Sequence, residues 1–378
     1  MNPHEILEYF QGRQGAIVDA IREIVDIESP SHDAERNRKV ADWVERQAIA
    51  TGAAAVVERV SVDDGDHVIV RAFPMGGKHT MLLGHIDTVH PVGARVRNPT
   101  RIEGDKFYGC GIFDMKANVV LMLETLRYFV TTGTQPRRPI TIMLACDEEV
   151  GSHTGRPLVE REAANAAQCM VFEPSADGSV KTGRKGTGTF MLRALGKPAH
   201  AGLEPEKGAN AVVEISRQIE RIHAIACIEN GTAVNVTTIK GGTTSNVIPE
   251  HAECEVDVRF SKMTEAARVN DEFQALVSFD ERVTLEILGG INRMPLERTP
   301  AVVAFYETAR DLAASFDYDL GETQVGGASD GNFVAALGVP VLDGLGITGA
   351  GAHMLTEHIL VSDIAKRATL VTMLLMSD

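Results

Sequence analysis

Three short apolar segments in the first half of the chain each end in a side chain that can bind a metal or move a proton. Residues 81–84 lead into His85, residues 140–146 into Asp147-Glu148-Glu149, and residues 169–172 into Glu173. Such apolar runs, separated by helical patterns, predict the buried strands of an α/β protein. Because ligands of open α/β sheets bind beyond the carboxyl ends of the strands, this repetition predicts one functional site at one sheet edge.

The first segment also contains Asp87, two residues after His85. Side chains two apart on an extended chain point the same way, so both can face one point. A histidine that binds a metal usually donates its other ring N–H to a carboxylate or carbonyl, and Asp87 is placed for that role. Taken alone, the pair is equally well explained by a strand end and a turn.

Other candidate ligands also have ordinary structural explanations when each is taken alone. The three carboxylates at 147–149 would raise one another's pKa unless solvent or a cation compensates them, so a solvated acidic loop is one interpretation. Asp114 precedes a helix predicted from Lys116 to Tyr128 and could be its N-cap. His353 lies in a glycine-rich loop before the last helix.

Bulk properties exclude several classes of protein. A chain of 378 residues exceeds one comfortable core and favours two domains. A formal net charge of −15 argues against a nucleic-acid partner. The sequence lacks both a run of ~18 apolar residues for a membrane span and a secretory signal. Its five cysteines form no Cys-x-x-Cys pair, so we expect a cytoplasmic protein without disulfides.

The pattern changes near Gly186. Strands are predicted at 189–195, 233–239, 252–260 and 282–288, and helices at 210–225 and 265–277. This βαββαβ order predicts a ferredoxin-like α+β domain, a four-stranded antiparallel sheet backed by two helices. We expect this domain at 187–295, inserted into a first domain made of residues 1–186 and 296–378.

Several short motifs together resemble those of one family. They are His85-Ile86-Asp87-Thr88-Val89, Gly111-x-x-Asp114-Met115-Lys116, Asp147-Glu148-Glu149-x-Gly151-Ser152, Ala199-His200-Ala201-Gly202 and the late His353. The set resembles the dinuclear zinc peptidases and amidohydrolases of peptidase family M20, and is most similar in style to bacterial glutamate carboxypeptidases. Aminoacylases, acetylornithine deacetylases and succinyl-diaminopimelate desuccinylases belong to the same family. The resemblance implies a mixed-sheet α/β/α catalytic domain with an inserted dimerisation domain.

The resemblance also implies a metal centre with two Zn²⁺ ions, for which Co²⁺ or Mn²⁺ can substitute. Its ligands would be His85, Asp114, Glu149, Glu173 and His353, with Asp114 bridging both ions. A cis peptide bond is expected between Asp114 and Met115. Histidine and carboxylate ligands without thiolates are typical of catalytic zinc, which keeps a position open for water.

Roles for three further residues follow from the same resemblance. Glu148 would be the general base that takes a proton from water and returns it to the leaving amine. Asp87 would orient His85. His200 would help stabilise the carbonyl oxygen in the partner subunit's site, so a homodimer formed through the inserted domain is expected.

The implied substrate is a small peptide or an N-acyl-amino acid with a free carboxylate. Residues that match substrate-binding positions are Asn246, Arg259, Arg293, Gly327 and Ser329. A guanidinium can bind a carboxylate through two hydrogen bonds. The expected enzyme is a carboxypeptidase that releases C-terminal glutamate or a similar residue. An N-acyl-amino-acid deacylase of deacetylase or desuccinylase type is the alternative.

Two other classes remain open on the sequence. Gly327-Ala328-Ser329-Asp330-Gly331 fits the Gly-x-Ser-x-Gly pattern of a serine hydrolase, and Asp343 and His353 follow in the order of its triad. This motif needs a strong buried strand before the serine, however, and residues 322–325 are short and polar. A metal-free relative that acts as a binding protein is the other class, although all five ligand positions hold competent ligands.

Overall fold

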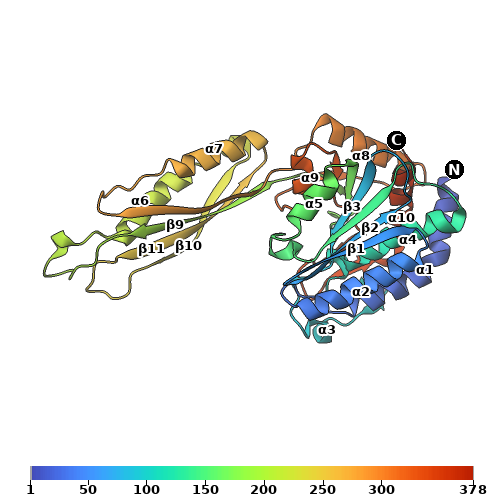
Figure 1. Ribbon diagram of the computed structural model, residues 1–378, viewed down its shortest axis with the longest axis horizontal. Coiled ribbons are helices and arrows are strands. Elements are labelled where there is room, and N and C mark those ends of the chain that lie inside the picture. Colours follow the sequence, from blue (N-terminus) through green and yellow to red (C-terminus); the bar gives the residue numbers. More distant parts are fainter. Residues whose placement is uncertain (1, 378) are drawn as a thin grey trace. The chain divides into compact units, whose positions relative to one another are not determined.

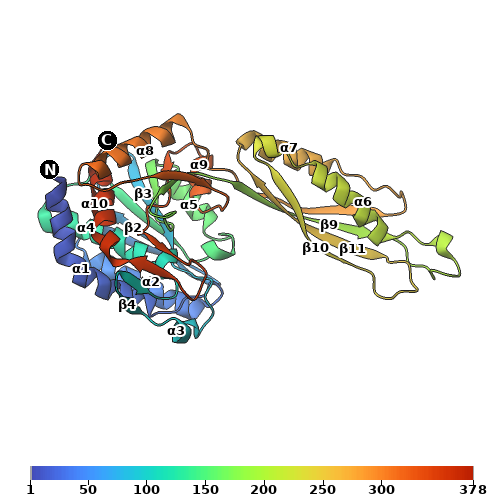
Figure 2. The same ribbon diagram turned by 180° about the vertical axis from the view of Figure 1, so that it is seen from behind.

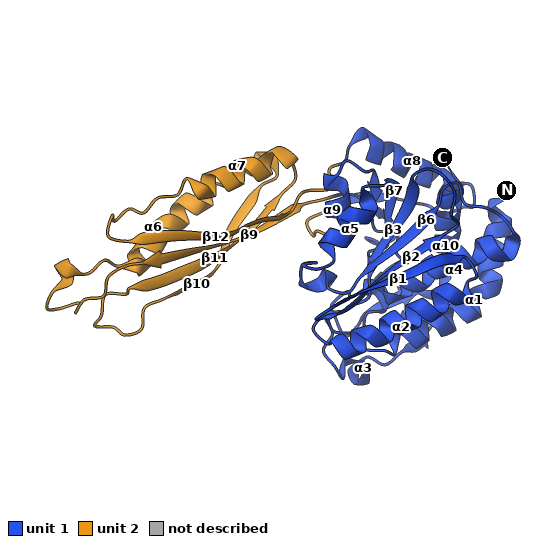
Figure 3. Cartoon of the chain, in the orientation of Figure 1, with its two compact units in different colours: residues 1–183, 298–324, 329–378 blue, residues 184–297, 325–328 orange. Residues whose placement is uncertain are grey.

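The computed structural model describes residues 2–377, which form two compact units (Figures 1 and 3). The first unit comprises the chain up to residue 183, residues 298–324 and the chain from 329 onward, and the second comprises 184–297 and 325–328. The segment 325–328, expected in the first domain, groups with the second unit. The reason is local: the Lys185 N–H donates to the carbonyl of Val325 (3.1 Å), and Arg184 Nη1 donates to that of Gly327 (3.2 Å).

A six-stranded mixed sheet forms the middle layer of the first unit. In spatial order its strands are β1 (Ala54–Val62), β2 (Gly65–Ala72), β6 (Ile140–Ala145), β3 (His79–His85), β7 (Ala166–Val171) and β14 (Val341–Leu342). β3 pairs in parallel with β6 and β7, whereas β2 pairs antiparallel with both β1 and β6. The carboxyl ends of β6, β3 and β7 therefore lie side by side.

Helices cover both faces of this sheet (Figures 1 and 2). On one face pack α1 (Pro3–Val25), α2 (Ala34–Ala50), α4 (Ala117–Thr132) and α10 (Val361–Met376), with α8 (Pro300–Ala314) against α10; on the other lie α5 (Arg156–Ala163) and α9 (Gly331–Ala336). Side chains of successive strand residues point to opposite faces of the sheet. Leu82 belongs to the large core under α4, whereas Met81 and Leu83 are buried outside it. The predicted α/β/α layering is confirmed.

A small antiparallel sheet in the first unit joins two distant parts of the chain. Its strands are β15 (Gly349–Ala350), β16 (His358–Leu360), β5 (Lys106–Tyr108) and β4 (Arg101–Glu103), and the four-residue helix α3 (Ala94–Arg97) precedes β4. The β15–β16 hairpin carries His353 in its loop, and β5 leads toward Asp114. Because β16 pairs with β5, these two segments become neighbours.

The second unit has the predicted βαββαβ order. Its antiparallel sheet has the order β10 (Ala233–Gly241), β11 (His251–Phe260), β9 (Gly186–Leu195), β12 (Thr284–Arg293), and its helices are α6 (Ala211–Ala224) and α7 (Met263–Gln274). Its core includes stacked rings of Phe190 and Phe273, 3.8 Å apart. A separate two-stranded sheet pairs β8 (Val180–Arg184) with β13 (Glu322–Val325).

Over residues 2–377, every helix is too short or too polar to cross a lipid bilayer.

Candidate metal centre

The ends of three neighbouring parallel strands place three of the predicted ligands together. His85 is the last residue of β3 and lies opposite Ala145 of β6. Glu148 and Glu149 follow β6 in a short turn, and Glu173 follows β7. Because the strands are parallel and in register, their chain continuations emerge at one sheet edge, as the sequence pattern predicted.

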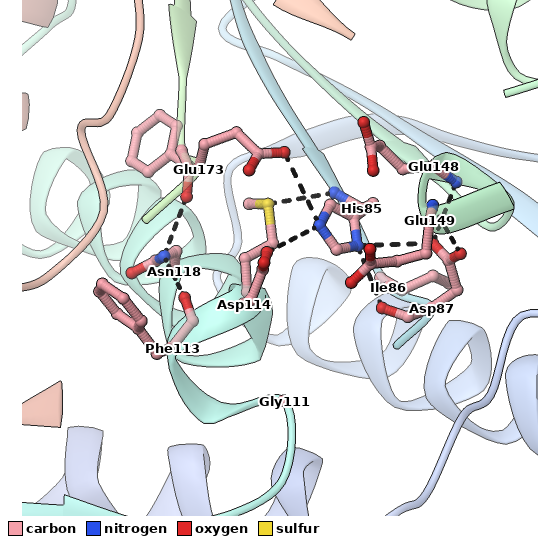
Figure 4. Close-up of polar contacts among 12 residues, drawn as sticks. His85, Ile86, Asp87, Gly111, Phe113, Asp114, Asn118, Glu148, Glu149 and Glu173 are labelled. Atoms are coloured by element: carbon pink, nitrogen blue, oxygen red, sulfur yellow. Dashed lines mark hydrogen bonds and ion pairs between the residues drawn. The ribbon is translucent and has the colours of Figure 1, made fainter. Parts of the chain in front are cut away.

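Carboxylates surround the buried imidazole of His85 (Figure 4). His85 is 1% exposed, and its Nε2 lies 3.1 Å from Oδ1 of Asp114 and 3.7 Å from Oε1 of Glu173. Ligand atoms of His85, Glu148 and Glu173 lie within 4.8 Å of one another, and so do those of His85, Asp114 and Glu149. Both triads can hold a metal ion.

His353 approaches the same carboxylates from the β15–β16 loop. Its Nε2 lies 3.3 Å from Oδ2 of Asp114 and 3.3 Å from Oε2 of Glu149. Its backbone has φ of +65°, which is uncommon for a residue with a side chain. Asp114 therefore presents one oxygen to His85 and the other to His353, as a bridging carboxylate would.

The carboxylates of this cluster favour positive charge on the two histidines. Burial would lower the pKa of His85, but hydrogen bonds to Asp114 and Asp87 raise it well above its usual value. Hydrogen bonds that His353 donates to Asp114 and then to Glu149 raise the pKa of His353 to about 10. Glu149 Oε1 is buried and has no hydrogen-bond partner within residues 2–377. Imidazole and carboxylate donors, with a buried oxygen left over, fit Zn²⁺.

Asp87 supports both His85 and the acidic turn. Nδ1 of His85 lies 3.0 Å from the backbone carbonyl of Asp87 and 3.4 Å from its Oδ1. The carboxylate also accepts the N–H groups of Glu148 and Glu149, each at 3.2 Å, and the hydroxyl of Ser31 at 2.8 Å. The nearest acceptor for His85 is thus the carbonyl of Asp87 rather than the expected carboxylate, which mainly orders the turn of Glu148.

The peptide bond between Asp114 and Met115 is cis, as the resemblance implied. The N-cap interpretation of Asp114 is wrong, because α4 begins at Ala117 and its N-cap position is Lys116.

Sequence reasoning missed several residues that hold the ligands in place. Asn118 donates to the carbonyls of Phe113 (3.2 Å) and Phe172 (2.9 Å) and so joins the segments of Asp114 and Glu173. Glu357 is fully buried and accepts the N–H of Asp114. Asn118 could have been recognised from the sequence, because it is an amide in the first turn of an apolar helix. Glu357 could not, because its role depends on the pairing of distant segments.

The remaining predicted residues lie mostly in the second unit. His200 is exposed, and its Nδ1 accepts the N–H groups of Gly202 (3.1 Å) and Leu203 (3.2 Å). Asn246 is its neighbour, since the Ala201 N–H donates to the Asn246 carbonyl (2.9 Å).

The two predicted arginines lie elsewhere in that sheet. Arg259 and Arg293 both pair with Thr187 of β9. Arg259 forms an ion pair with Asp257 (2.8 Å), and Arg293 is mostly buried. Gly327 is exposed, and its carbonyl accepts from Arg184.

Ser329, predicted to bind substrate, is buried in the first unit. The residue is 0% exposed, and its hydroxyl donates to Oδ2 of Asp343 (2.7 Å) and accepts the Gly331 N–H (3.2 Å). The histidine of the serine-hydrolase alternative, His353, instead contacts Asp114 and Glu149. Ser329 is therefore inaccessible and lacks its base, which removes that alternative.

Paired histidines and carboxylates at the carboxyl edge of an α/β/α sheet define a metal-dependent hydrolase. The family model "Peptidase family M20/M25/M40" matches residues 81–377, and the chain belongs to this family. It is 30% identical to carboxypeptidase G2 of Pseudomonas sp. (strain RS-16) over 96% of this chain and 89% of that one. It is 28% identical to a succinyl-diaminopimelate desuccinylase of Delftia acidovorans over 75% and 77% of the two chains.

Solved structures share the fold. Aminopeptidase PepT from Bacillus cereus is similar with a TM-score of 0.77 and 21% identity, over 96% of this chain and 98% of that one. The M20 family metallo-carboxypeptidase Sso-CP2 from Sulfolobus solfataricus is similar with a TM-score of 0.71 and 14% identity, over 95% and 98%. The protein is thus a hydrolase of the M20 fold, and the metal-free binding alternative is disfavoured because all five ligand side chains converge.

Proposed function

We propose that this protein is a zinc-dependent carboxypeptidase that cleaves the amide bond to a C-terminal glutamate or a similar amino acid. The main support is the convergence of His85, Asp114, Glu149, Glu173 and His353 at one sheet edge, together with 30% identity to carboxypeptidase G2 along nearly the whole chain. The substrate is a small peptide or an N-acyl-amino acid.

These five side chains would hold two Zn²⁺ ions, and Asp114 would contribute to both positions. His85 and Glu173 would complete one position, and Glu149 and His353 would complete the other. When bound, the metals polarise the scissile carbonyl and make water acidic enough to attack it near neutral pH.

Glu148 is the general base and acid that transfers a proton from water to the leaving amine. Its carboxylate reaches the cluster of His85 and Glu173, while its N–H is anchored to Oδ1 of Asp87 (3.2 Å). It takes a proton from the attacking water and returns it to the amine that leaves. Asp87 acts through the geometry of His85 and of the turn, and so is a positioning residue.

The two sides of the substrate meet different parts of the protein in this proposal. Arg293 and Arg259 of the second unit bind the free carboxylate, together with Asn246 supplied by a second subunit. An open hollow of about 560 Å³ in the first unit adjoins Glu149 and receives the acyl side. The apolar part of its wall includes Pro30, Val89, Pro91 and Val92.

A substrate panel tests the proposed reaction. We expect N-acyl- and aroyl-glutamates to be hydrolysed with higher kcat/KM than acetylornithine, succinyl-diaminopimelate or simple dipeptides. The variant Arg293→Ala removes a charged hydrogen bond worth ~1.5–3 kcal/mol, so its kcat/KM for the glutamate substrates falls ~10–100-fold. Arg310→Ala, which removes an exposed arginine that forms an ion pair with its neighbour Asp311, is the control.

The deacylase alternative predicts a different result. The similarity to desuccinylases favours it, and a panel led by succinyl-diaminopimelate or acetylornithine would establish it instead. Unchanged glutamate selectivity in Arg293→Ala would remove the role proposed for that arginine.

The site is completed by a second subunit in this proposal. His200 and Asn246 lie beyond the end of β9 where Leu195 pairs with His251, whereas Arg259 and Arg293 lie at Thr187. Thr187 and Leu195 are roughly 25 Å apart at ~3.3 Å per residue, more than a small substrate spans. In this proposal one chain therefore does not bring both pairs of residues to one substrate, whereas a symmetric homodimer can. The exposed edge strand β10, with Ile239 55% exposed, supplies a surface for pairing.

Mixing two inactive variants tests the shared site. His200→Ala and Glu148→Gln homodimers should each be nearly inactive, because every site lacks one group. After subunit exchange, half of the dimers are mixed and have one intact site, so we expect about a quarter of wild-type activity to return. Absence of recovery, when mixed dimers are demonstrated by differently tagged chains, would contradict a shared site.

A cytoplasmic location is part of the proposal. All five cysteines are free, four of them buried, as suits a reducing compartment.

A further inference from the structure

Glu357 occupies the junction between the two loops that carry Asp114 and His353. It lies four residues after His353, directly before β16, and is 0% exposed. Its Oε1 accepts the N–H groups of Phe113 (2.8 Å) and Asp114 (2.9 Å). Its Oε2 accepts the N–H of Gly111 (2.8 Å) and Nε2 of His90 (2.6 Å).

These four contacts use the whole accepting capacity of the carboxylate. An ionised carboxyl group has about four acceptor positions, and a buried one is tolerated only when it is paired and hydrogen-bonded. Charge-assisted hydrogen bonds of this kind are roughly twice as strong as neutral ones. All acceptor positions of the Glu357 carboxylate are therefore occupied, and it can act on a metal only through the loops that carry Asp114 and His353.

The backbone of Glu357 adds to the same connection. Its N–H donates to the carbonyl of Met354 (3.2 Å) inside the His353 loop, and its carbonyl accepts the N–H of Gly109 (3.3 Å). The next residue, His358, pairs with Tyr108 of β5. Main chain and side chain of one residue thus fix the two ligand loops against each other.

We propose that Glu357, together with His90, is a positioning residue that sets Asp114 against His353 and thereby governs the affinity of one of the two metal positions. This inference rests on the metal centre of the proposed function. The affected position is the one shared by Asp114, Glu149 and His353. The other retains His85 and Glu173, which are held by β3 and β7 and do not depend on the His353 loop.

The test is metal affinity in Glu357→Gln, measured on metal-stripped protein by Zn²⁺ titration against a competing chelator. Glutamine keeps the size of the side chain but replaces one acceptor oxygen by an NH₂ group, which faces N–H donors and cannot bond to them. We expect one of the two metal affinities to fall ~10–100-fold, the range for residues that orient metal ligands, and the other to stay unchanged.

Glu214→Gln is the matched control. Glu214 is a buried carboxylate of the second unit that also accepts loop N–H groups, those of Phe279 (3.0 Å) and Asp280 (3.3 Å). Both variants lose stability in urea unfolding of the metal-free protein, but only Glu357→Gln should change metal affinity. If Glu357→Gln does not fold by circular dichroism, His90→Ala takes its place and should weaken the same position.

If folded Glu357→Gln binds Zn²⁺ at both positions with wild-type affinity, the proposal is overturned. An equal loss of Zn²⁺ affinity at both positions would overturn it as well. A wild-type protein that binds no Zn²⁺ would instead overturn the metal centre of the proposed function.

Discussion

Glu148→Gln should lower kcat by ~10²–10⁴-fold, the usual contribution of a general base, while KM and metal content stay near their wild-type values. The amide keeps the size of the side chain and its backbone anchor on Asp87, but it cannot accept the proton of the attacking water. Steady-state kinetics on the best glutamate substrate and metal analysis of the same preparation measure the two effects.

Glu160→Gln serves as the control for this variant. Glu160 lies on α5 and forms an ion pair with Arg156 at the surface, so its loss should leave kcat unchanged. A Glu148→Gln enzyme with wild-type kcat would contradict the proposed base. A loss of metal that accounts for the whole fall in kcat would make Glu148 a ligand instead.

Asp114→Asn should abolish tight binding of at least one metal and lower kcat/KM by ~10³-fold or more, since metal catalysis supplies several kcal/mol. Both oxygens of Asp114 face a histidine, at 3.1 Å from His85 and 3.3 Å from His353. Asparagine keeps one acceptor and removes the charge, so it cannot bridge two cations. Metal content per chain after dialysis and kcat/KM in added Zn²⁺ are the measurements.

Asp105→Asn is a suitable comparison for Asp114→Asn. Asp105 also joins two chain segments, accepting the N–H (2.8 Å) and hydroxyl (2.6 Å) of Ser362, but it is exposed and touches none of the candidate ligands. It should keep both metals. Two metals retained by Asp114→Asn, with activity close to wild type, would refute the bridging role.

The local pattern of the chain was sufficient to predict the strands that end in candidate ligands. Residues 140–145 form a fully buried strand because all of them except Thr141 are apolar, and the acidic turn follows at once. The βαββαβ order of the second unit was equally readable, since periodicity is a local property. The candidate ligands were identifiable because their motifs resemble those of a family.

The sequence could not reveal which segments support those ligands. Ser329 fits a nucleophile motif, yet its burial against Asp343 follows from the packing of α9 on β7 and β14. Likewise, the carboxylate of Asp87 binds the Glu148 turn more than His85, a matter of distances that spacing does not set.

The sequence by itself therefore determined the layers and the inserted unit, because these follow from periodicity, and it supplied the set of candidate metal-binding side chains through the family resemblance. Only the tertiary structure decided that β16 pairs with β5, which brings His353 to Asp114 and places Glu357 between their loops. The physical reason is that backbone hydrogen bonds between strands are the same for any sequence. The choice of partner strand thus depends on packing across some 250 residues, which no local pattern records.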